Sequence, residues 1–309
     1  MGEARPRNFL GLDPADADPR RAAVAILPVP YEATVSYGGG TRQGPQAIID
    51  ASSIVELYDH EADDEPYHVG VATLDAVPLS VEGPERAMRQ LRRAYAAALR
   101  PGRFVILLGG EHSVSGPPIL EHAARLRKRG RRLSVLQFDA HGDLRNSWEG
   151  SPYSHACAMR RVVGHSDLVQ VGIRAIAREE RGVMRRFGVT TVFAHEMVED
   201  DAWMDRALGA LGRDVYVTID IDYFDPSLVP STGTPEPGGG TWYPTLRLLE
   251  RLFRERHVVA ADVVELAPIP GMPAPDFLAA KLVYKLIGYH VRSRRGSRRA
   301  ALRGAARRG

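Results

Sequence analysis

The chain of 309 residues is long enough for one large α/β domain or two ordinary ones, and its 44% hydrophobic and 26% charged residues are typical of a soluble globular protein. Its net charge is +3, but residues 291–309 hold eight Arg and no acid, so removing these eight charges leaves −5 on residues 1–290. The single cysteine, Cys157, excludes an intrachain disulfide. The start of the chain shows no signal-peptide pattern, and no run of about 18 apolar residues occurs, so we expect a cytoplasmic protein with no membrane partner.

Strand-like and helix-like segments alternate along the chain. Residues 1–21 are rich in Pro, Asp and Arg and are predicted to be irregular and on the surface. A Gly-rich loop at 29–45 follows the first apolar strand and ends in Pro45 at a helix start. Strands are predicted at residues 22–28, 68–74, 103–108, 133–138, 168–173, 189–193, 214–219 and 258–264. Helices are predicted at residues 46–58, 85–99, 117–128, 178–187, 201–211, 245–256 and 275–291.

Eight strands separated mostly by helices predict one α/β domain with a parallel sheet, because parallel strands need connections long enough to hold a helix. No linker rich in Ser, Gly or Pro divides residues 22–291. Residues 292–309 form an Arg-rich tail that we expect to be disordered. Arg clusters bind phosphate without sequence preference, but no aromatic residues are interleaved here, so no nucleic-acid partner is predicted.

Six potential metal ligands follow three of the predicted strands. Side chains two positions apart leave a strand in the same direction, and the carboxyl ends of parallel strands meet at one edge of the sheet, where such folds place their sites. A single Asp at the end of a strand is more typical of a helix cap or a turn, but here three strands end in the same chemistry. The six residues are His112, Asp139, His141, Asp143, Asp220 and Asp222.

This ligand set indicates two divalent ions. Six side-chain donors suit two ions, and carboxylates with two imidazoles and no thiolate favour Mn²⁺, with Zn²⁺, Co²⁺ and Fe²⁺ as alternatives. Two ions about 3.5–4 Å apart can share one water molecule and convert it to hydroxide near neutral pH. The pattern therefore predicts hydrolysis of a poor electrophile.

Several longer motifs give the chain a family resemblance. They are GGEHS at residues 109–113, FDAHGDLR at 138–145, SHA at 154–156, DIDYFDPSLVPSTGTPEPGG at 220–239 and DVVEL at 262–266, with GTRQGPQAI at 40–48 in support. From residue 22 to about residue 289 the chain resembles the ureohydrolase family, which contains arginases, agmatinases, guanidinobutyrases and formimidoylglutamases. The resemblance implies a three-layer α/β/α sandwich around an eight-stranded, mostly parallel sheet.

The same resemblance implies roles for individual residues. Glu265 would bind the guanidinium group of the substrate, His155 would shuttle protons, and Asp143 would relay a proton to the leaving amine. The alternatives are a capping or surface carboxylate for Glu265 and an ordinary loop histidine for His155. Two Mn²⁺ per subunit are implied, one bound by His112, Asp139, Asp143 and Asp220 and the other by Asp139, His141, Asp220 and Asp222.

Departures from the arginase pattern narrow the substrate. Arginases hold the substrate carboxylate with a Ser-Gly-Asn group before the catalytic histidine, where this chain reads WEGSPYS at 148–154. The aspartates that follow the GIR motif of arginases are replaced by Ala-Ile-Ala at 175–177. The chain is therefore predicted to convert agmatine, which has no α-carboxylate, to putrescine and urea in polyamine biosynthesis. Trp148, Glu149 and Tyr153 are expected to contact the far end of this substrate.

Other assignments remain open. Gly142 stands where agmatinases frequently have Thr, and Ala156 follows His155 where Gly is frequent, so N1-aminopropylagmatine and guanidinobutyrate are alternative substrates. A ureohydrolase-like binding or regulatory protein without activity is the alternative of another class, although none of the six ligands is replaced. The resemblance also implies a homo-oligomer, either a trimer or a hexamer.

Overall fold

The computed structural model describes the backbone of residues 6–306 and the side chains of residues 6–296. Over this range, eight strands form one sheet in the order β2-β1-β3-β8-β7-β4-β5-β6, and all neighbouring strands are parallel. The predicted eight-stranded sheet is confirmed. The strands are β1 (Val24–Val29), β2 (Val71–Thr73), β3 (Phe104–Gly109), β4 (Leu133–Phe138), β5 (Asp167–Ile173), β6 (Thr190–Phe193), β7 (Asp214–Asp220) and β8 (His257–Val264).

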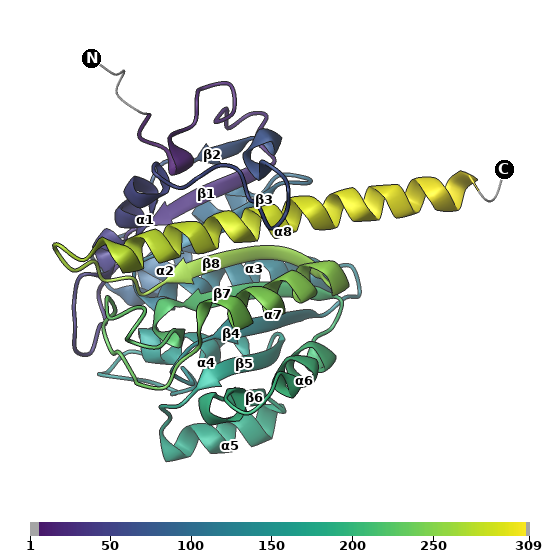
Figure 1. Cartoon of the computed structure of the whole chain (residues 1–309). Helices are drawn as coiled ribbons and strands as arrows, with labels where there is room; N and C mark the ends of the chain where they lie inside the picture. Colours follow the sequence, from purple (N-terminus) through teal and green to yellow (C-terminus); the bar gives the residue numbers. More distant parts are fainter. Residues whose placement is uncertain (1–5, 307–309) are drawn as a thin grey trace.

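Helices cover both faces of the sheet and complete the predicted α/β/α sandwich (Figure 1). They are α1 (Gly44–Ser52), α2 (Pro84–Ala98), α3 (Gly116–Arg127), α4 (Ala158–Val162), α5 (Arg178–Phe187), α6 (Ala202–Ala210), α7 (Trp242–Glu255) and α8 (Pro273–Ala306). Alternate strand residues point to opposite faces. In β3, Ile106 belongs to the core cluster of α1, α6, α7 and α8, whereas Leu107 packs with α2. Helices α3, α4 and α5 pack with β4 and β5 in a third cluster.

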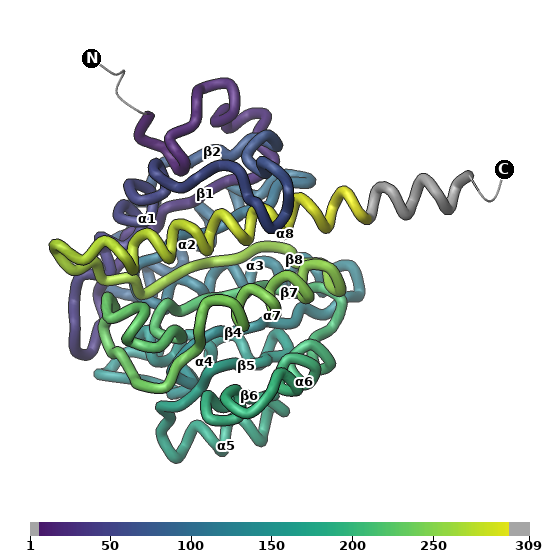
Figure 2. Tube along the Cα trace, viewed as in Figure 1, coloured from purple at the N-terminus to yellow at the C-terminus, as the bar shows by residue number. Residues whose placement is uncertain are grey.

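Helix α8 joins distant parts of the chain. It packs along both α1 and α7, as the chain traces show (Figures 1 and 2). Lys285 of α8 is buried and pairs with Asp59 and Glu61 at 2.8 Å each, which ties the turns after α1 to this helix. No helix within residues 6–306 combines the length and the apolar character needed to cross a membrane.

Four local features differ from the sequence prediction. Helix α1 ends at Ser52 rather than at residue 58, and α4 is too short to show a helical period. The N-terminal segment also reaches the interior, because Phe9 and Leu10 are buried in the core. Helix α8 continues past residue 291 to Ala306, since Ala and Arg favour helix. The disorder predicted for residues 307–309 lies outside the described residues.

The order of the strands explains where the site forms. Strand β4 follows β3 in the chain, but β8 and β7 lie between them in the sheet. The segments that leave β3 and β4 therefore depart on either side of β8 and β7. In open parallel sheets, such a position at the carboxyl ends of the strands forms the crevice that binds ligands.

Candidate metal centre

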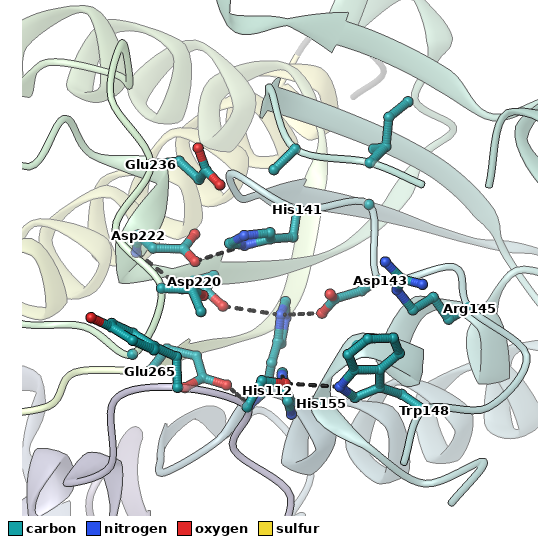
Figure 3. A pocket seen from close by; sticks show the side chains of 18 of the residues that line it. His112, His141, Asp143, Arg145, Trp148, His155, Asp220, Asp222, Glu236 and Glu265 are labelled. Atoms are coloured by element: carbon teal, nitrogen blue, oxygen red, sulfur yellow. Dashed lines mark hydrogen bonds and ion pairs between the residues drawn. The ribbon is translucent and has the colours of Figure 1, made fainter. Parts of the chain in front are cut away.

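A cavity of about 490 Å³ opens at the carboxyl ends of β3, β8, β7 and β4. Asp139 is fully buried, and its carboxylate contacts both histidines of the predicted ligand set. Figure 3 shows the other predicted site residues around the cavity, with His112 at the centre of the group. The structure thus brings together all eight residues that were predicted as metal ligands or catalytic groups. Those that line the cavity are His112, His141, Asp143, His155, Asp220, Asp222 and Glu265.

His112 faces three carboxylates. Its Nδ1 atom lies 2.9 Å from Asp143 Oδ2, 3.1 Å from Asp139 Oδ2 and 3.3 Å from Asp220 Oδ2. The same Nδ1 atom is buried and makes no properly directed hydrogen bond to a described residue. Buried polar atoms without a partner are rare in folded proteins and call for an explanation. A nitrogen and three oxygens that converge in this way are suitable ligands for a divalent cation.

A second donor group adjoins the first. His141 Nδ1 lies 2.9 Å from Asp222 Oδ2 and 3.6 Å from Asp139 Oδ1. Asp139 therefore presents one oxygen to each histidine. Ligand atoms of the first group (His112, Asp139 and Asp220) lie within 4.8 Å of one another, and so do those of the second group (Asp139, His141 and Asp222). This geometry fits two cations that share the carboxylate of Asp139.

Hydrogen bonds hold the carboxylates in these orientations. Asp139 accepts bonds of 2.6 Å from the side chain of Gln137 and from the backbone N–H of His141. Asp222 accepts from the backbone N–H of Ala140 at 3.0 Å, and Asp220 accepts from the backbone N–H of Asp222 at 3.0 Å. The ligand oxygens are thus oriented by the chain before any ion binds.

The electrostatics of this space also fit a cation pair. Burial, reinforced by Asp222 and Asp139, raises the pKa of Asp220 well above its usual value. Burial likewise raises the pKa of Glu265 and, together with Asp139, that of Asp143. Buried carboxylates oppose one another's ionisation, and divalent cations remove this opposition. The residues present therefore fit the two metal ions that the resemblance implies.

A polar chain behind His112 fixes its tautomer. Thr218 Oγ1 donates a hydrogen bond of 2.6 Å to Asp262, which also accepts from the hydroxyl of Tyr216 at 2.8 Å. His112 Nε2 lies 3.0 Å from the same Thr218 oxygen. Since the hydroxyl hydrogen points to Asp262, Nε2 of His112 is the donor, and Nδ1 keeps the lone pair that a metal ion needs. Neither Thr218 nor Asp262 was predicted as a site residue, although a polar residue inside an apolar strand is a signal that suits both.

His155 lies at the edge of the cavity between two hydroxyl groups. Its Nδ1 atom is 3.3 Å from Thr34 Oγ1, and its Nε2 atom is 3.1 Å from Ser36 Oγ. Ser36 also accepts a hydrogen bond of 2.9 Å from the indole N–H of Trp148. Both ring nitrogens therefore have a partner that can accept or donate a proton, which suits a group that transfers protons.

Glu111, which was given no role from the sequence, anchors the loop that carries these hydroxyls. It is fully buried and accepts hydrogen bonds from the backbone N–H groups of Ala33 (2.6 Å) and Thr34 (2.7 Å). It also accepts from the hydroxyls of Thr34 (2.7 Å) and Ser113 (2.6 Å). Its position directly before His112 was the only signal in the sequence, because its main partners lie far away along the chain.

Two site residues have left-handed backbone conformations. Asp143 has φ 54° and Glu265 has φ 64°, values that cost energy for residues other than Gly and are often found at functional sites. Glu265 is held in this conformation by its own N–H, which donates to the Gly110 carbonyl at 2.8 Å. One of its carboxylate oxygens accepts from the His112 N–H at 2.6 Å. Since Glu265 lines the cavity, its other oxygen is available to a ligand.

The loop contacts expected from the sequence are only partly present. Trp148 lines the cavity, and the guanidinium of Arg145 lies 4.4 Å from its ring centroid. Glu149 and Tyr153 do not line the cavity, because Glu149 is exposed in a turn with φ 48° and Tyr153 lines a separate small hollow beside α2 and α3. Glu236, which was not predicted as a site residue, lines the cavity.

Packing explains why residue 142 is Gly rather than Thr. A Cβ atom at this position would lie 3.0 Å from the side chains of both Glu180 and Ile176. Glu180 is itself buried and accepts hydrogen bonds from the N–H groups of Leu144 and Ala177. The space that a Thr side chain would take is therefore occupied by neighbours in this chain.

Comparisons with known proteins agree with this geometry. Residues 22–288 match the model of the Arginase family. An N(1)-aminopropylagmatine ureohydrolase from Thermus thermophilus is 40% identical over 274 residues, which cover 88% of this chain and 92% of the relative. An agmatinase from Pyrococcus horikoshii is 35% identical over 281 residues, which cover 89% and 94%.

A solved structure supports the same conclusion. The agmatine ureohydrolase of Thermoplasma volcanium aligns with a TM-score of 0.81 and 28% identity, covering 93% of this chain and 95% of that one. The sheet order, the site and the extent of the matches lead to one assignment. The chain belongs to the arginase family and is a ureohydrolase.

Proposed function

We propose that this ureohydrolase releases urea from a guanidino amine without an α-carboxylate, and that N1-aminopropylagmatine is preferred to agmatine. The observation that carries the proposal is the pair of donor groups sharing Asp139, beside the available carboxylate oxygen of Glu265. Hydrolysis of a guanidinium group needs an activated water molecule and an anion that holds the cation, and these two features are suited to supply them.

Two Mn²⁺ per subunit would bind to the six predicted ligands. Their carboxylate and imidazole donors without thiolate favour this ion. When bound, the metal pair would supply a nucleophile of lowered pKa and stabilise negative charge on the substrate. His112 and Asp143 would hold one ion and His141 and Asp222 the other, with Asp139 and Asp220 shared.

The chain's own residues would orient the substrate and move protons. Glu265 would bind the N–H groups of the guanidinium with its available oxygen. Asp143 would relay a proton to the leaving amine, and His155 would exchange protons with solvent through Thr34 and Ser36, which lie 3.3 and 3.1 Å from its ring nitrogens. These assignments give a separate role to each of the three catalytic residues.

The residues that line the far end of the cavity favour an amine substrate. Residues 175–177 line the wall after β5 with Ala-Ile-Ala, which offer no side-chain group for an α-carboxylate or α-amine. Glu236 lines the cavity, and its carboxylate has no partner among the described residues, so it would attract the distal ammonium of a polyamine. The relative named for N1-aminopropylagmatine is 40% identical, against 35% for the agmatinase, which favours the longer substrate and reverses the order expected from the sequence.

The test is urea release with Mn²⁺ supplied, measured as kcat/KM for N1-aminopropylagmatine, agmatine, guanidinobutyrate and arginine. The proposal expects the highest value for N1-aminopropylagmatine, the next for agmatine and little turnover of the other two. Replacing Glu236 by Gln should reduce the advantage of the longer substrate while leaving Mn²⁺ binding intact. Tight Mn²⁺ binding without urea from any compound would favour the inactive binding protein instead. The cytoplasmic location and the trimer or hexamer remain predictions.

A further inference from the structure

The amino ends of the central strands carry a groove lined by arginines. Two hollows of about 560 and 580 Å³ adjoin where β3, β7 and β8 begin, and they share Gly102, His290 and Arg294. We call them together the arginine groove. Of the arginines in the first hollow, only Arg295 forms an ion pair with a described carboxylate, that of Asp64. The arginines of this hollow are Arg20, Arg21, Arg100, Arg103, Arg294 and Arg295.

The charge of this groove departs from that of the whole chain, which has 41 basic and 38 acidic residues. The second hollow adds Arg213, Arg254 and Arg256 and a single acid, Glu255. The carboxylate of Glu255 already accepts hydrogen bonds from Arg251 and Arg254. Nine arginines therefore line the groove with almost no compensating charge, and their mutual repulsion favours an anionic ligand.

A buried imidazole forms part of both hollows. His290 is 8% exposed, and its Nε2 atom has no hydrogen-bond partner among the described residues. Phe104 stacks on the imidazole with ring centroids 4.1 Å apart and planes inclined by 13°, which fixes the orientation of the ring. Arg103 Nε is a second buried atom with no hydrogen-bond partner in the described part of the chain. Unpaired buried polar atoms are rare, and two of them beside one groove indicate a place where a polar ligand binds.

Several guanidinium groups of the groove remain free to bind. Arg100 and Arg103 both donate to the carbonyl oxygen of Pro19, a neutral acceptor that leaves their charge uncompensated. Arg21 and Arg213 are exposed and form no side-chain hydrogen bond or ion pair with any described residue. The planar guanidinium group can bind two phosphate oxygens at once, so these side chains are suited to a phosphate chain.

We propose that the arginine groove binds a small polyphosphate anion, of the kind present in a nucleoside triphosphate or in inorganic tripolyphosphate. Each hollow has a volume within the range of small-molecule sites, which is roughly 300–1,000 Å³. The aromatic rings next to the groove are buried, as Phe104 and Phe253 show, so no exposed ring among the described side chains of the groove offers a stacking platform for the bases of a single strand. The chemistry therefore favours a short phosphate chain over a nucleic acid.

The test is isothermal titration of the full-length, Mn²⁺-loaded protein with tripolyphosphate and, separately, with ATP at 0.15 M salt. The groove variant combines Arg21→Gln, Arg213→Gln and Arg294→Gln, which remove three charges and only one internal hydrogen bond, that from Arg294 to the Gly102 carbonyl. Both probes also chelate Mn²⁺, but this contribution is the same in every variant because the metal centre is unchanged.

The matched control combines Arg127→Gln, Arg129→Gln and Arg185→Gln. These three arginines are exposed at the ends of α3 and α5, near the amino ends of β4 and β6, and form no side-chain ion pair with a described residue. The control therefore loses the same charge at the same edge of the sheet but outside the groove. A third variant replaces the five arginines after residue 296 by Gln and tests the tail.

The proposal expects tripolyphosphate to bind the native protein, the control and the tail variant alike, and to bind the groove variant more weakly by on the order of tenfold or more. Equal affinity for tripolyphosphate and ATP would show that the phosphate chain alone is recognised, whereas tighter ATP binding would add a nucleoside contact. Equal affinity of the groove variant and the native protein would overturn the proposal. So would a loss of binding in the tail variant instead, or groove-dependent binding of single-stranded RNA without binding of either small anion.

Discussion

Strands β3, β7 and β8 begin among arginines and end among carboxylates. At the carboxyl ends, Asp220 is 3% exposed and Glu265 is 7% exposed, and each has one oxygen held by a backbone N–H. At the amino ends, Arg21 and Arg213 are exposed and unpaired among the described residues. Water can screen the exposed charges, but the buried carboxylates need a bound cation or a proton. Substitutions of the carboxylates at the carboxyl ends should therefore reduce activity strongly, and substitutions of the arginines at the amino ends should reduce it only weakly.

Replacing Asp139 by Asn should have the largest effect. Asp139 is the carboxylate common to both donor groups, and Asn keeps its shape but removes its charge. We expect loss of bound Mn²⁺ and a drop in urea release on the order of 10³-fold or more. Bound metal is measured by atomic emission after gel filtration, in parallel with turnover.

The matched control for this variant is Asp201→Asn. Asp201 is exposed and pairs only with Arg247 at the surface, an interaction worth about 0–1 kcal/mol. It should keep its metal and its turnover. Two bound ions and normal turnover in Asp139→Asn would show that this carboxylate does not belong to the metal centre.

Glu265→Gln should separate substrate binding from metal binding. The amide retains an oxygen that can accept from the His112 N–H but loses the negative charge that faces the guanidinium. We expect kcat/KM to fall by about 10²–10³-fold with both ions retained. Metal content and turnover are measured on the same sample. Equal losses of bound metal and of turnover would instead mean that Glu265 acts by orienting His112 through the hydrogen bond from the His112 N–H.

Thr218→Val should have a smaller effect, because Thr218 acts through His112. Losing the hydroxyl removes the acceptor for the Nε2–H group and leaves Asp262 with one fewer hydrogen bond. We expect Mn²⁺ affinity to fall by about 10–100-fold, with turnover recovered at excess Mn²⁺. Thr218→Ser, which keeps the hydroxyl, serves as the control. A turnover defect that excess Mn²⁺ leaves unchanged would contradict a positioning role.

The sequence was informative at the carboxyl edge because the ligands occupy alternate positions directly after apolar strands. The period of a strand predicted that Asp139, His141 and Asp143 lie together, and they do, although β4 ends at Phe138 and the three residues follow it. Thr218 and Asp262 could not be assigned in this way, because their role depends on the pairing of β7 with β8, where they lie opposite each other. Nothing in a single sequence states that register.

The arginine groove was harder still to predict. Arg21, Arg103, Arg213 and Arg294 lie far apart in the sequence and follow no motif. They meet because β1, β3, β8 and β7 begin side by side and α8 passes over them. Only the Arg-rich tail could be found from the sequence, because its arginines are neighbours along the chain. The arginines of the groove are neighbours only in the folded protein.

Histidines at the two edges have opposite pKa shifts, which predicts a pH effect. Burial opposes the charged form of both rings, but Asp222 and Asp139 raise the pKa of His141 to about 12, whereas burial next to Arg294 lowers that of His290 to about 3. His290 is thus neutral in the folded protein and takes up a proton on unfolding below its ordinary pKa of 6.5. Its contribution to stability is present in full above pH 6.5 and is lost as the pH falls towards 3.

His290→Phe tests this effect, because the variant keeps an aromatic ring to stack on Phe104 but cannot take up a proton. The free energy of unfolding is measured by urea denaturation at pH 7.5 and at pH 5. Its decrease between these two pH values should be smaller in the variant than in the native protein. The expected difference is about 2 kcal/mol, since roughly 1.4 kcal/mol is lost per pH unit below 6.5. The comparison between the two proteins cancels the titration of the metal ligands, which is common to both. Parallel losses in the two proteins would mean that His290 binds a proton equally well folded and unfolded, and that the arginines beside it are screened by solvent.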